Sequence, residues 1–492
     1  MNILFIQPSS GFLMRGTTYP ICRSMLVTAS FMKSLGYNVL IYDRCIDFQK
    51  SAKVISSFSP DFVMVYVTPT SSLKDAVELS KLSKQNSAYV AWGEVVASAL
   101  SEEIVKNGYA DFVITGETES KLLSLIKELN GSKNYATVPG LTYVENGSVI
   151  TTQNANNSDL INLPKIDWEL VDVNRCFRSF PHCGRMLYMY TSRGCPFKCK
   201  YCYNTMFYNS QHRKRPLNFV LEEILYLEKN KKLDGVNFSD ELLLLSDDEI
   251  NQIYEFRKNN DLKFFWGGET RADIYNADKL KKMYDAGCRW LLLGIETGSK
   301  ETREQIDKPM DHNQIRSFVD NCTQVGISTF GSFIIGFPDE TPERLKETAE
   351  FALSLNLDAF LFNYFIAIPK TPLCDSLIAE GKFTYEDVIN QASASSKIQC
   401  LTDNYSAIHA KDLLVVKSYF DWLTFTRKKK EAAQKSMFIK KAFDVLKHLT
   451  DGGIKRSFVN LYDAAKTFLT VLYYSHAYPK IIKKYGLHNI NK

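Results

Sequence analysis

Three cysteines have the residue type and spacing that most clearly indicate chemistry. Cys195, Cys199 and Cys202 stand at C-x3-C-x2-C spacing, directly after the apolar run at residues 187–190. Three thiolates on one short loop can bind three irons of a [4Fe-4S] cluster, and the fourth iron then has no protein ligand. Because an open metal position can bind and activate a cofactor or a substrate, the loop predicts an enzyme.

A zinc site and a chance group of buried thiols are also compatible with these cysteines. A tetrahedral zinc site needs a fourth ligand at a matching short spacing. No second C-x2-C occurs in the chain, but His182 and Cys183 stand near enough in sequence to complete a site. The remaining cysteines are scattered singly, mostly within apolar patterns, as is typical of buried, unreactive thiols.

The run from Ser192 to Cys202 resembles the cluster loop of the radical S-adenosylmethionine (SAM) enzymes, in which an aromatic residue precedes the third cysteine, as Tyr201 does here. The resemblance implies that the open iron binds the amino and carboxylate groups of SAM. Reductive cleavage of SAM then yields a 5′-deoxyadenosyl radical that abstracts hydrogen from the substrate. An external electron donor, such as flavodoxin or ferredoxin, is implied as well.

The elements that position this loop alternate between apolar strands and amphipathic helices. Six such units predict a partial parallel (β/α)6 barrel, in which chemistry takes place at the carboxyl ends of the strands. We predict strands at 187–192, 234–239, 262–267, 290–296, 329–335 and 359–366, and helices at 218–230, 246–260, 276–286, 312–325 and 342–355.

Polar residues and glycines follow four of these strands, and each group resembles a position at which radical SAM enzymes bind SAM. The resemblance implies that the backbone at Ser239, Asp240 and Glu241 faces the methionine amino group. It further implies that Glu296 binds a ribose hydroxyl and that Gly336 lines the adenine, with Arg271 in the same site. Glycines at strand ends can also serve only to permit tight turns.

One element departs from the family's pattern. The family's Gly-Gly-Glu follows the second strand, whereas Gly267-Gly268-Glu269 follows the third predicted strand here. We therefore interpret the literal match as a coincidence.

Residues 1–135 predict a separate doubly wound, flavodoxin-like domain. Short, nearly continuous apolar runs at 2–7, 38–43, 62–68, 88–92 and 111–115 are typical of strands buried on both faces, and helical patterns such as 72–84 and 117–129 separate them. Such a domain binds ligands beyond the carboxyl ends of its strands. No G-x-G-x-x-G or P-loop follows the first strand, so a nucleotide phosphate site is not supported.

Ahead of a radical SAM barrel, this unit resembles a cobalamin-binding domain. No histidine precedes His182, so the D-x-H-x-x-G loop that supplies an imidazole to cobalt is absent from it. A domain that has lost its cofactor and serves as a scaffold is the alternative. The resemblance implies cobalamin contacts at Thr68, Ser71, Gly93, Gly116 and Glu117.

The composition fits a large globular protein of several domains. The 492 residues are 45% hydrophobic and 23% charged, no apolar stretch approaches the length of a membrane span, and a strand begins directly after Met1. Mostly isolated cysteines fit a reducing compartment, so we expect a cytoplasmic protein. We predict a cobalamin-binding domain at 1–135, a linker with a hairpin at 136–185, the radical SAM barrel at 186–385, and a helical region at 386–492.

The excess of positive over negative charge is confined to the end of the chain. Residues 411–492 hold 17 Lys and Arg against 6 Asp and Glu, whereas the whole chain has a net charge of only +5. Such a pattern is most often a packed helical region with a solvated basic face, and peripheral contact with an anionic membrane or an acidic substrate is the alternative. No nucleic-acid-binding module is recognisable.

Together these features predict a cobalamin-dependent radical SAM enzyme that methylates an unactivated carbon of a small-molecule or carrier-bound substrate. Cyclisation or rearrangement without net methyl transfer is the alternative within the same superfamily. A corrinoid carrier or sensor with a relic barrel is the alternative from a different class. No motif identifies the substrate.

Overall fold

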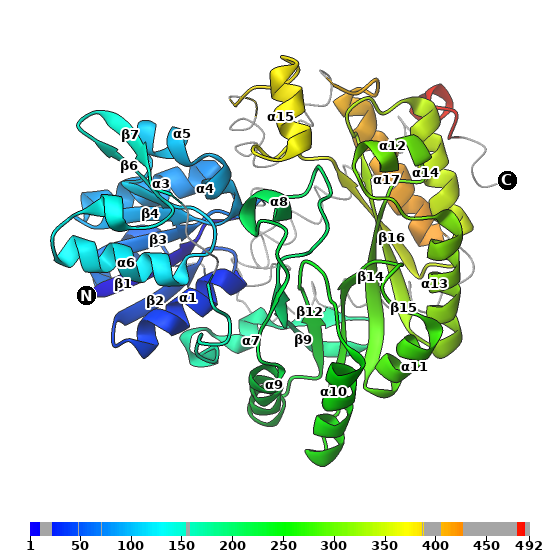
Figure 1. Ribbon diagram of the computed structural model, residues 1–492, viewed down its shortest axis with the longest axis horizontal. Coiled ribbons are helices and arrows are strands. Elements are labelled where there is room, and N and C mark those ends of the chain that lie inside the picture. Colours follow the sequence, from blue (N-terminus) through cyan, green and yellow to red (C-terminus); the bar gives the residue numbers. More distant parts are fainter. Residues whose placement is uncertain are drawn as a thin grey trace.

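Two seven-stranded sheets, each covered by helices, form the two halves of the molecule (Figure 1). The computed structural model describes residues 1–9, 22–47, 49–69, 71–153, 158–385, 387, 405–426 and 480–487.

The first sheet contains five parallel strands whose side chains are buried from both faces. Its order is β2-β1-β3-β4-β5-β6-β7, so the parallel part runs 2-1-3-4-5. Alternate residues of β1 enter two different cores, with Ile3 and Phe5 in one and Leu4 and Ile6 in the other, which explains the continuous apolar run. The strands are β1 (Asn2–Gln7), β2 (Asn38–Asp43), β3 (Phe62–Tyr66), β4 (Tyr89–Gly93) and β5 (Phe112–Ile114), and the helices are α1 (Arg23–Ser34), α2 (Ser51–Phe58), α3 (Leu73–Gln85), α4 (Val95–Ala99), α5 (Ser101–Lys106) and α6 (Glu119–Asn130).

The predicted hairpin extends this first sheet. Strands β6 (Leu141–Glu145) and β7 (Ser148–Thr151) are joined by Asn146 and Gly147, both with positive φ, as an Asn-Gly hairpin turn requires. Strand β6 pairs antiparallel with β5 and covers what would otherwise be an open sheet edge.

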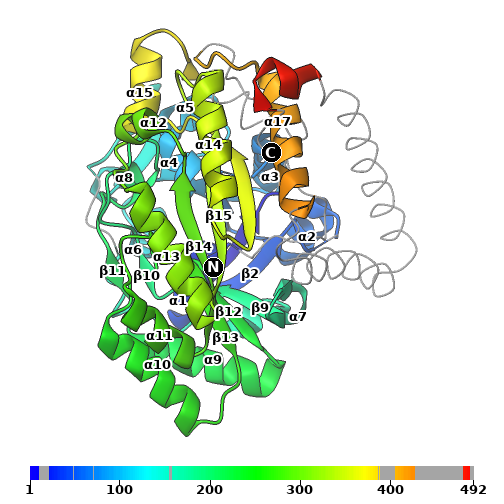
Figure 2. The same ribbon diagram turned by 90° about the vertical axis from the view of Figure 1, so that its right-hand side faces the viewer.

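The second sheet is the predicted partial barrel. Six parallel strands follow one another in chain order, and β8 (Arg178–Phe180) pairs antiparallel with the first of them. The helices lie on the outer side of the curled sheet (Figures 1 and 2). The parallel strands are β9 (Cys183–Met189), β12 (Gly235–Phe238), β13 (Phe265–Thr270), β14 (Cys288–Glu296), β15 (Ser328–Ile335) and β16 (Ala359–Tyr364), and the helices are α9 (Leu217–Lys231), α10 (Asp247–Asn259), α11 (Ala277–Asp285), α13 (His312–Val325) and α14 (Pro342–Ser354).

Most predicted strand limits agree with the structure to within two residues, but the starts of two strands differ by more. Strand β9 begins at Cys183, before the apolar run at 187–190, because β8 pairs with its first residues. Strand β13 begins at Phe265, where its ladder with β12 starts, although Leu262 and Phe264 before it are also buried. Apolar residues at these positions indicate which segments are buried, whereas hydrogen bonding to the neighbouring strand determines where each strand begins.

Several short elements have no clear sequence signal. They are α7 (Val173–Cys176), α8 (Asn204–Phe207), α12 (Lys300–Gln305) and α15 (Pro372–Ala379), and the two-residue strands β10 (Ser192–Arg193) and β11 (Arg213–Lys214), which pair antiparallel.

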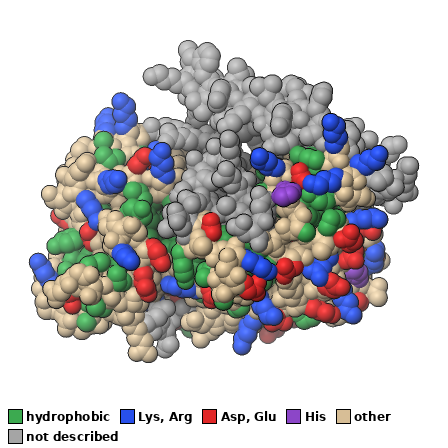
Figure 3. Space-filling model, turned by 90° about the horizontal axis from the view of Figure 1, so that it is seen from above, with side chains coloured by type: hydrophobic (Ala, Val, Ile, Leu, Met, Phe, Trp, Pro, Cys, Tyr) green, Lys and Arg blue, Asp and Glu red, His purple; other side chains and the backbone are tan. Residues whose placement is uncertain are grey.

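The carboxyl-terminal region is described only in part. Helix α17 (Ala410–Thr426) packs on β16, with the rings of Phe420 and Phe362 4.4 Å apart. Most of the basic tail lies outside the described residues. On the face shown in Figure 3, acidic and basic side chains are intermixed over the described surface. Within the described ranges no helix is both long and apolar enough to cross a bilayer.

Candidate functional site

The cysteine loop begins where β10 ends, at the carboxyl edge of the second sheet. Gly194 has a φ of +80°, and a side chain there would place its Cβ 1.9 Å from the Gln211 carbonyl oxygen, so only glycine fits. The Cys195 amide donates to Asn204 Oδ1 at 2.8 Å, and Asn204 Nδ2 donates back to the Cys195 carbonyl at 2.7 Å. These bonds fix the loop backbone independently of any metal.

The three thiols lie in a largely water-excluded setting. Burial raises the pKa of Cys195 and of Cys199, and it raises the pKa of Cys202 to about 12. A negative charge on a neighbouring thiol raises the pKa of Cys195 and of Cys202 further, so the sulfurs sense one another. Iron bound by Cys195, Cys199 and Cys202 would replace the thiol protons and offset this repulsion, so the three thiols fit a shared cluster. Among the described residues, no three Cys, His, Asp or Glu side chains lie close enough together to bind a single metal ion. A [4Fe-4S] cluster needs a wider arrangement, because each thiolate binds a different iron.

The zinc alternative with His182 and Cys183 is wrong. Cys183 opens β9 and packs against Gly235, and His182 Nε2 lies 3.0 Å from the hydroxyl of Ser328, the first residue of β15. Both residues are therefore at the amino edge of the sheet. The length of β9 separates them from the cysteine loop by roughly 20 Å.

Asp240 and Glu241 hold the segment that leads into the cysteine loop. Asp240 accepts hydrogen bonds from the Thr191 amide at 2.8 Å, from the Thr191 hydroxyl, and from the Ser192 hydroxyl at 2.8 Å. Glu241 accepts the Gly194 amide at 2.8 Å. Burial raises the pKa of Asp240 to about 6. Both carboxylates are thus engaged by the protein, and the structure gives them a part in shaping the loop.

Glu296, Tyr201 and Gly336 come together on the opposite side of the loop. Glu296 has a φ of +66° and forms a buried ion pair with Lys308 at 2.5 Å. Burial and the neighbouring Glu296 carboxylate raise the pKa of Tyr201. The Tyr201 ring meets the edge of Phe337, which follows Gly336 at the end of β15, at 5.8 Å. Three of the predicted SAM residues therefore share one environment.

Arg271 lies beside the cysteines. Its guanidinium stacks 3.7 Å above the Phe197 ring and forms a two-point ion pair with Asp273 at 2.9 and 2.7 Å. Its positive charge lowers the pKa of Cys195 and Cys199, against the larger effect of burial. This placement suits a group that faces a cluster-bound anion.

The predicted cobalamin residues lie at the carboxyl edge of the first sheet. The hydroxyls of Thr68 and Ser71 are 3.0 Å apart after β3, and Gly116 follows β5 with a φ of +72°. Gly93 ends β4, where an added Cβ would approach Met64 Cε to 2.4 Å and Thr118 Cγ2 to 2.9 Å. Packing inside the sheet is a sufficient reason for that glycine.

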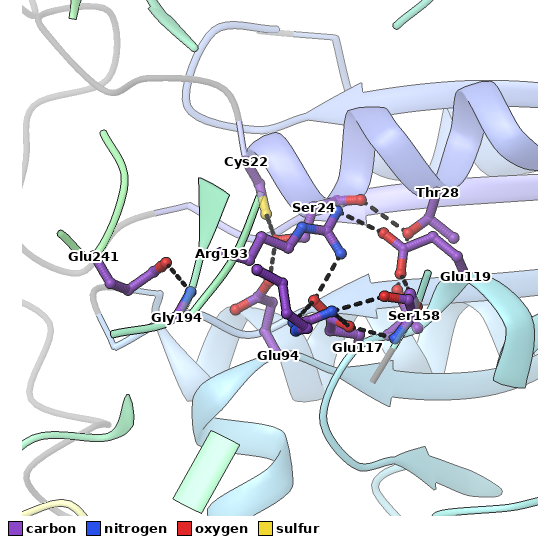
Figure 4. Close-up of polar contacts among 12 residues, drawn as sticks. Cys22, Ser24, Thr28, Glu94, Glu117, Glu119, Ser158, Arg193, Gly194 and Glu241 are labelled. Carbon is purple, nitrogen blue, oxygen red and sulfur yellow. Dashed lines mark hydrogen bonds and ion pairs between the residues drawn. The ribbon is translucent and has the colours of Figure 1, made fainter. Parts of the chain in front are cut away.

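Glu117 instead joins the two sheets through a buried network (Figure 4). Arg193, two residues before Cys195, bonds Glu117 at 3.0 Å and Glu119 at 2.8 Å. Arg213 bonds Glu117 at 2.8 Å, and the Ser158 amide donates to the Glu117 carboxylate at 2.6 Å. Burial opposes the charge on Glu117, but the two arginines outweigh it and lower its pKa. Both Glu117 oxygens are occupied, so its carboxylate serves this junction.

A second contact joins the same edges: Arg23, at the start of α1, donates to the carbonyl oxygen of Ser239. The carboxyl ends of the two sheets therefore face each other across the cysteine loop. Sequence reasoning missed Arg23, Arg193, Arg213 and Lys308, because their partners stand 12 to 216 positions away in sequence.

Comparison with known proteins identifies the second sheet. A domain model described as the radical SAM superfamily matches residues 189–352, from the end of β9 into α14. This range contains the cysteine loop and the polar strand ends described above.

The relatives extend over most of the chain. An uncharacterised methyltransferase of Pyrococcus horikoshii is 29% identical over 393 residues, which cover 77% of this chain and 84% of that protein. The anaerobic magnesium-protoporphyrin IX monomethyl ester cyclase of Rubrivivax gelatinosus is 25% identical over 73% of this chain and 66% of its own length.

A solved structure has the same arrangement. The radical SAM methyltransferase TsrM of Kitasatospora setae, solved with cobalamin and a [4Fe-4S] cluster bound, superposes with a TM-score of 0.65 at 16% identity, covering 77% of this chain and 78% of that one. The chain therefore contains a radical SAM domain at residues 189–352, and its overall fold is similar to that of TsrM.

Proposed function

We propose that this protein is a cobalamin-dependent radical SAM methyltransferase that acts on an unactivated carbon of a small-molecule or carrier-bound substrate. The observation that carries the proposal is the junction of the two sheets. Arg193 directly precedes the cysteine loop and bonds two carboxylates at the carboxyl edge of the first sheet. A cofactor at each edge would therefore face the other across a short, rigid boundary.

At the second sheet, Cys195, Cys199 and Cys202 would hold the cluster, and Tyr201, Arg271, Glu296 and Gly336 would surround SAM. Arg271 offers a cation near the position of a carboxylate, and Glu296 offers an acceptor for a hydroxyl. Asp240 and Glu241 shape the loop, and Ser239 supplies backbone at the same edge.

At the first sheet, the parallel strand order 2-1-3-4-5 is the flavodoxin-like order, with ligands beyond the carboxyl ends. Thr68, Ser71, Gly93 and Gly116 stand at those ends and would line cobalamin. No histidine of residues 1–181 is present to bind the cobalt. When bound, cobalamin supplies methyl-transfer chemistry and the cluster supplies the electron that cleaves SAM.

This proposal divides the chain into a cobalamin-binding domain at 1–135, a linker at 136–185, the radical SAM barrel at 186–385 and a helical region at 386–492. The hairpin β6–β7, although it extends the first sheet, falls in the linker of this division. Flavodoxin or ferredoxin would supply electrons in the cytoplasm, where thiolates stay reduced. The basic tail would allow peripheral contact with an anionic surface.

Ring closure or rearrangement without methyl transfer is the second candidate, favoured by the similarity to the cyclase of Rubrivivax gelatinosus. The two candidates share every residue assigned above. They differ in whether the methyl group of SAM reaches the product.

Anaerobic reconstitution of the full chain, with methyl-deuterated SAM, a reductant and a metabolite extract, tests the proposal. Methyl transfer predicts a deuterated product together with S-adenosylhomocysteine and 5′-deoxyadenosine in nearly equal amounts. Production of 5′-deoxyadenosine without labelled product or S-adenosylhomocysteine would refute methyl transfer and support the second candidate. Bound corrinoid without SAM cleavage would identify a carrier.

A further inference from the structure

The concave face of the second sheet has a sealed apolar floor. Trp290 crosses the sheet from β14, and its Nε1 donates to Asn237 Oδ1 at 2.8 Å. The indole lies over Gly267, where an added Cβ would come within 2.3 Å of the ring. Phe180 contacts Trp290 with ring centroids 4.9 Å apart and Phe330 at 5.3 Å. Gly267 is therefore required by the floor, which gives the Gly267-Gly268-Glu269 run a structural reason.

Above this floor, the inward-facing side chains are open to solvent. Strand residues alternate between faces, and the outward Leu291, Phe333 and Phe362 are almost fully buried under helices. Their inward neighbours are half-buried or exposed, and Leu361 is 42% exposed. The accessible inward positions of β13 to β16 include Glu269, Leu292, Ser332, Leu361 and Asn363.

Two polar groups on this face have no partner among the described residues: the Glu269 carboxylate and the Tyr188 hydroxyl. The other acidic groups nearby are engaged, since Glu241 accepts the Gly194 amide and Glu296 pairs with Lys308. The Glu269 carboxylate is accessible from solvent and has no partner among the described residues, so it is available to accept a hydrogen bond from a bound donor.

The carboxylates around Glu269 disfavour the binding of an anionic ligand beside it. The Glu269 side chain is accessible, but partial desolvation by the walls of the curled sheet raises its pKa to about 7. Arg23 lowers this pKa, and the carboxylates of Glu241, Glu296 and Asp240 raise it further. Burial also raises the pKa of Tyr188, which senses the charge of Glu269. The charged or titratable groups that face Glu269 are Arg23 from α1, Tyr188 from β9, Asp240 and Glu241 after β12, and Glu296 from β14.

We infer that the concave face of the half-barrel binds a substrate that combines an apolar body with an amine, amide or hydroxyl group, and that Glu269 accepts the hydrogen bond of that group. Leu292 and Leu361 contact the apolar body. The fate of the bound molecule rests on the proposed function, whereas the binding itself requires only residues of this chain.

A matched pair of probes tests this inference: 3-phenylpropylamine and 3-phenylpropanoate, titrated into the full chain at about pH 8 and followed by saturation-transfer difference NMR. A hydrogen bond to a charged group contributes about 1.5–3 kcal/mol, so the amine is expected to bind about ten- to a hundredfold more tightly than the carboxylate. Glu269→Gln should remove most of this preference. Leu361→Ala should weaken both probes by similar factors.

The pH supplies a second readout. Below pH 7 the Glu269 carboxyl takes up a proton, so lowering the pH to about 5.5 should weaken amine binding to the wild type but not to Glu269→Gln. Glu78→Gln is the matched control, because Glu78 lines a separate cavity of about 290 Å³ beside Trp92 and Tyr109 that could also admit an aromatic amine.

A preference for the amine that survives Glu269→Gln, or that Glu78→Gln removes, would overturn the inference, and so would equal or undetectable binding of the two probes. A chain that holds corrinoid and cleaves SAM but shows no amine preference contradicts this inference alone. A chain that prefers the amine through Glu269 but retains neither corrinoid nor cluster contradicts only the proposed function.

Discussion

Replacing Arg193 with methionine should separate the two reactions of SAM. Arg193 is 8% exposed, and its partners Glu117 and Glu119 are 2% and 1% exposed. Removing one member of a buried ion pair leaves an uncompensated charge and costs about 3–5 kcal/mol. Glu117 keeps Arg213 and the Ser158 amide, whereas among the described residues Glu119 keeps only the Ser158 hydroxyl at 3.0 Å. The substitution therefore mainly weakens the contacts between the two sheets.

The chain offers a matched control in Arg215→Met. Arg215 pairs with Glu223 at 2% and 3% exposure, and it stacks on Tyr190 at 5.1 Å, as Arg193 does at 5.2 Å. Both members of this pair lie on the side of the second sheet. The two variants should lose similar free energy of unfolding in urea, but only Arg193→Met weakens the contact between the two cofactor edges.

The assay measures S-adenosylhomocysteine and 5′-deoxyadenosine from the reconstituted full chain supplied with reduced cobalamin. In the proposed function, cleavage of SAM would need only the site on the second sheet, whereas methyl transfer to cobalamin would need both edges in register. A misplacement of about 1 Å can cost about 10²-fold in rate, so we expect S-adenosylhomocysteine to fall by at least about tenfold more than 5′-deoxyadenosine in Arg193→Met. An unchanged product ratio, or an equal change in Arg215→Met, would refute the reasoning.

Further predictions concern the cluster, SAM, the cobalt and the buried Glu340. Cys199→Ala should retain the fold but lose iron and SAM cleavage, and unchanged iron content would contradict the cluster assignment. Glu296→Gln should weaken SAM binding by about ten- to a hundredfold, measured by equilibrium dialysis with Lys308→Met as a control for the lost ion pair; an unaltered affinity would place the ribose contact elsewhere. Cobinamide bound to the full chain, with no base of its own, should give a reduced-cobalt paramagnetic resonance spectrum without nitrogen splitting, and such splitting would reveal a protein ligand. Burial raises the pKa of Glu340 to about 8, so the wild type becomes less stable as the pH rises from about 5 to 8; Glu340→Gln should be spared, and parallel melting curves across this range would contradict the shift.

The local pattern was sufficient for the main strands and helices and for the cysteine loop, but not for the short elements between them. Apolar runs buried from both faces identified β1 to β5, and the alternation of strands with amphipathic helices identified the partial barrel. The spacing of Cys195, Cys199 and Cys202 identified the loop because thiols that bind one cluster must lie on one short segment. These features depend on residues that are close in sequence.

The partners of the site residues could not be predicted in this way. Glu117 has the residue type expected of a ligand contact, yet its carboxylate bonds Arg193 and Arg213, which stand 76 and 96 positions away. Asp240 likewise turns to Thr191, 49 positions earlier. A carboxylate accepts hydrogen bonds from the donors that the fold places beside it. The sequence pattern does not show which distant residues those donors are.

Glu269 illustrates the same division. The run Gly267-Gly268-Glu269 was visible in the sequence and was interpreted as a coincidence because it follows the wrong strand. Only the curled sheet shows that Trp290 needs the space above Gly267 and that Glu269 has no partner among the described residues around this floor. By itself the sequence determined which strands and helices form and which thiols lie together, because those depend on local spacing. The tertiary structure alone decided which charges are paired and which remain available, because pairing depends on contacts between residues distant in sequence.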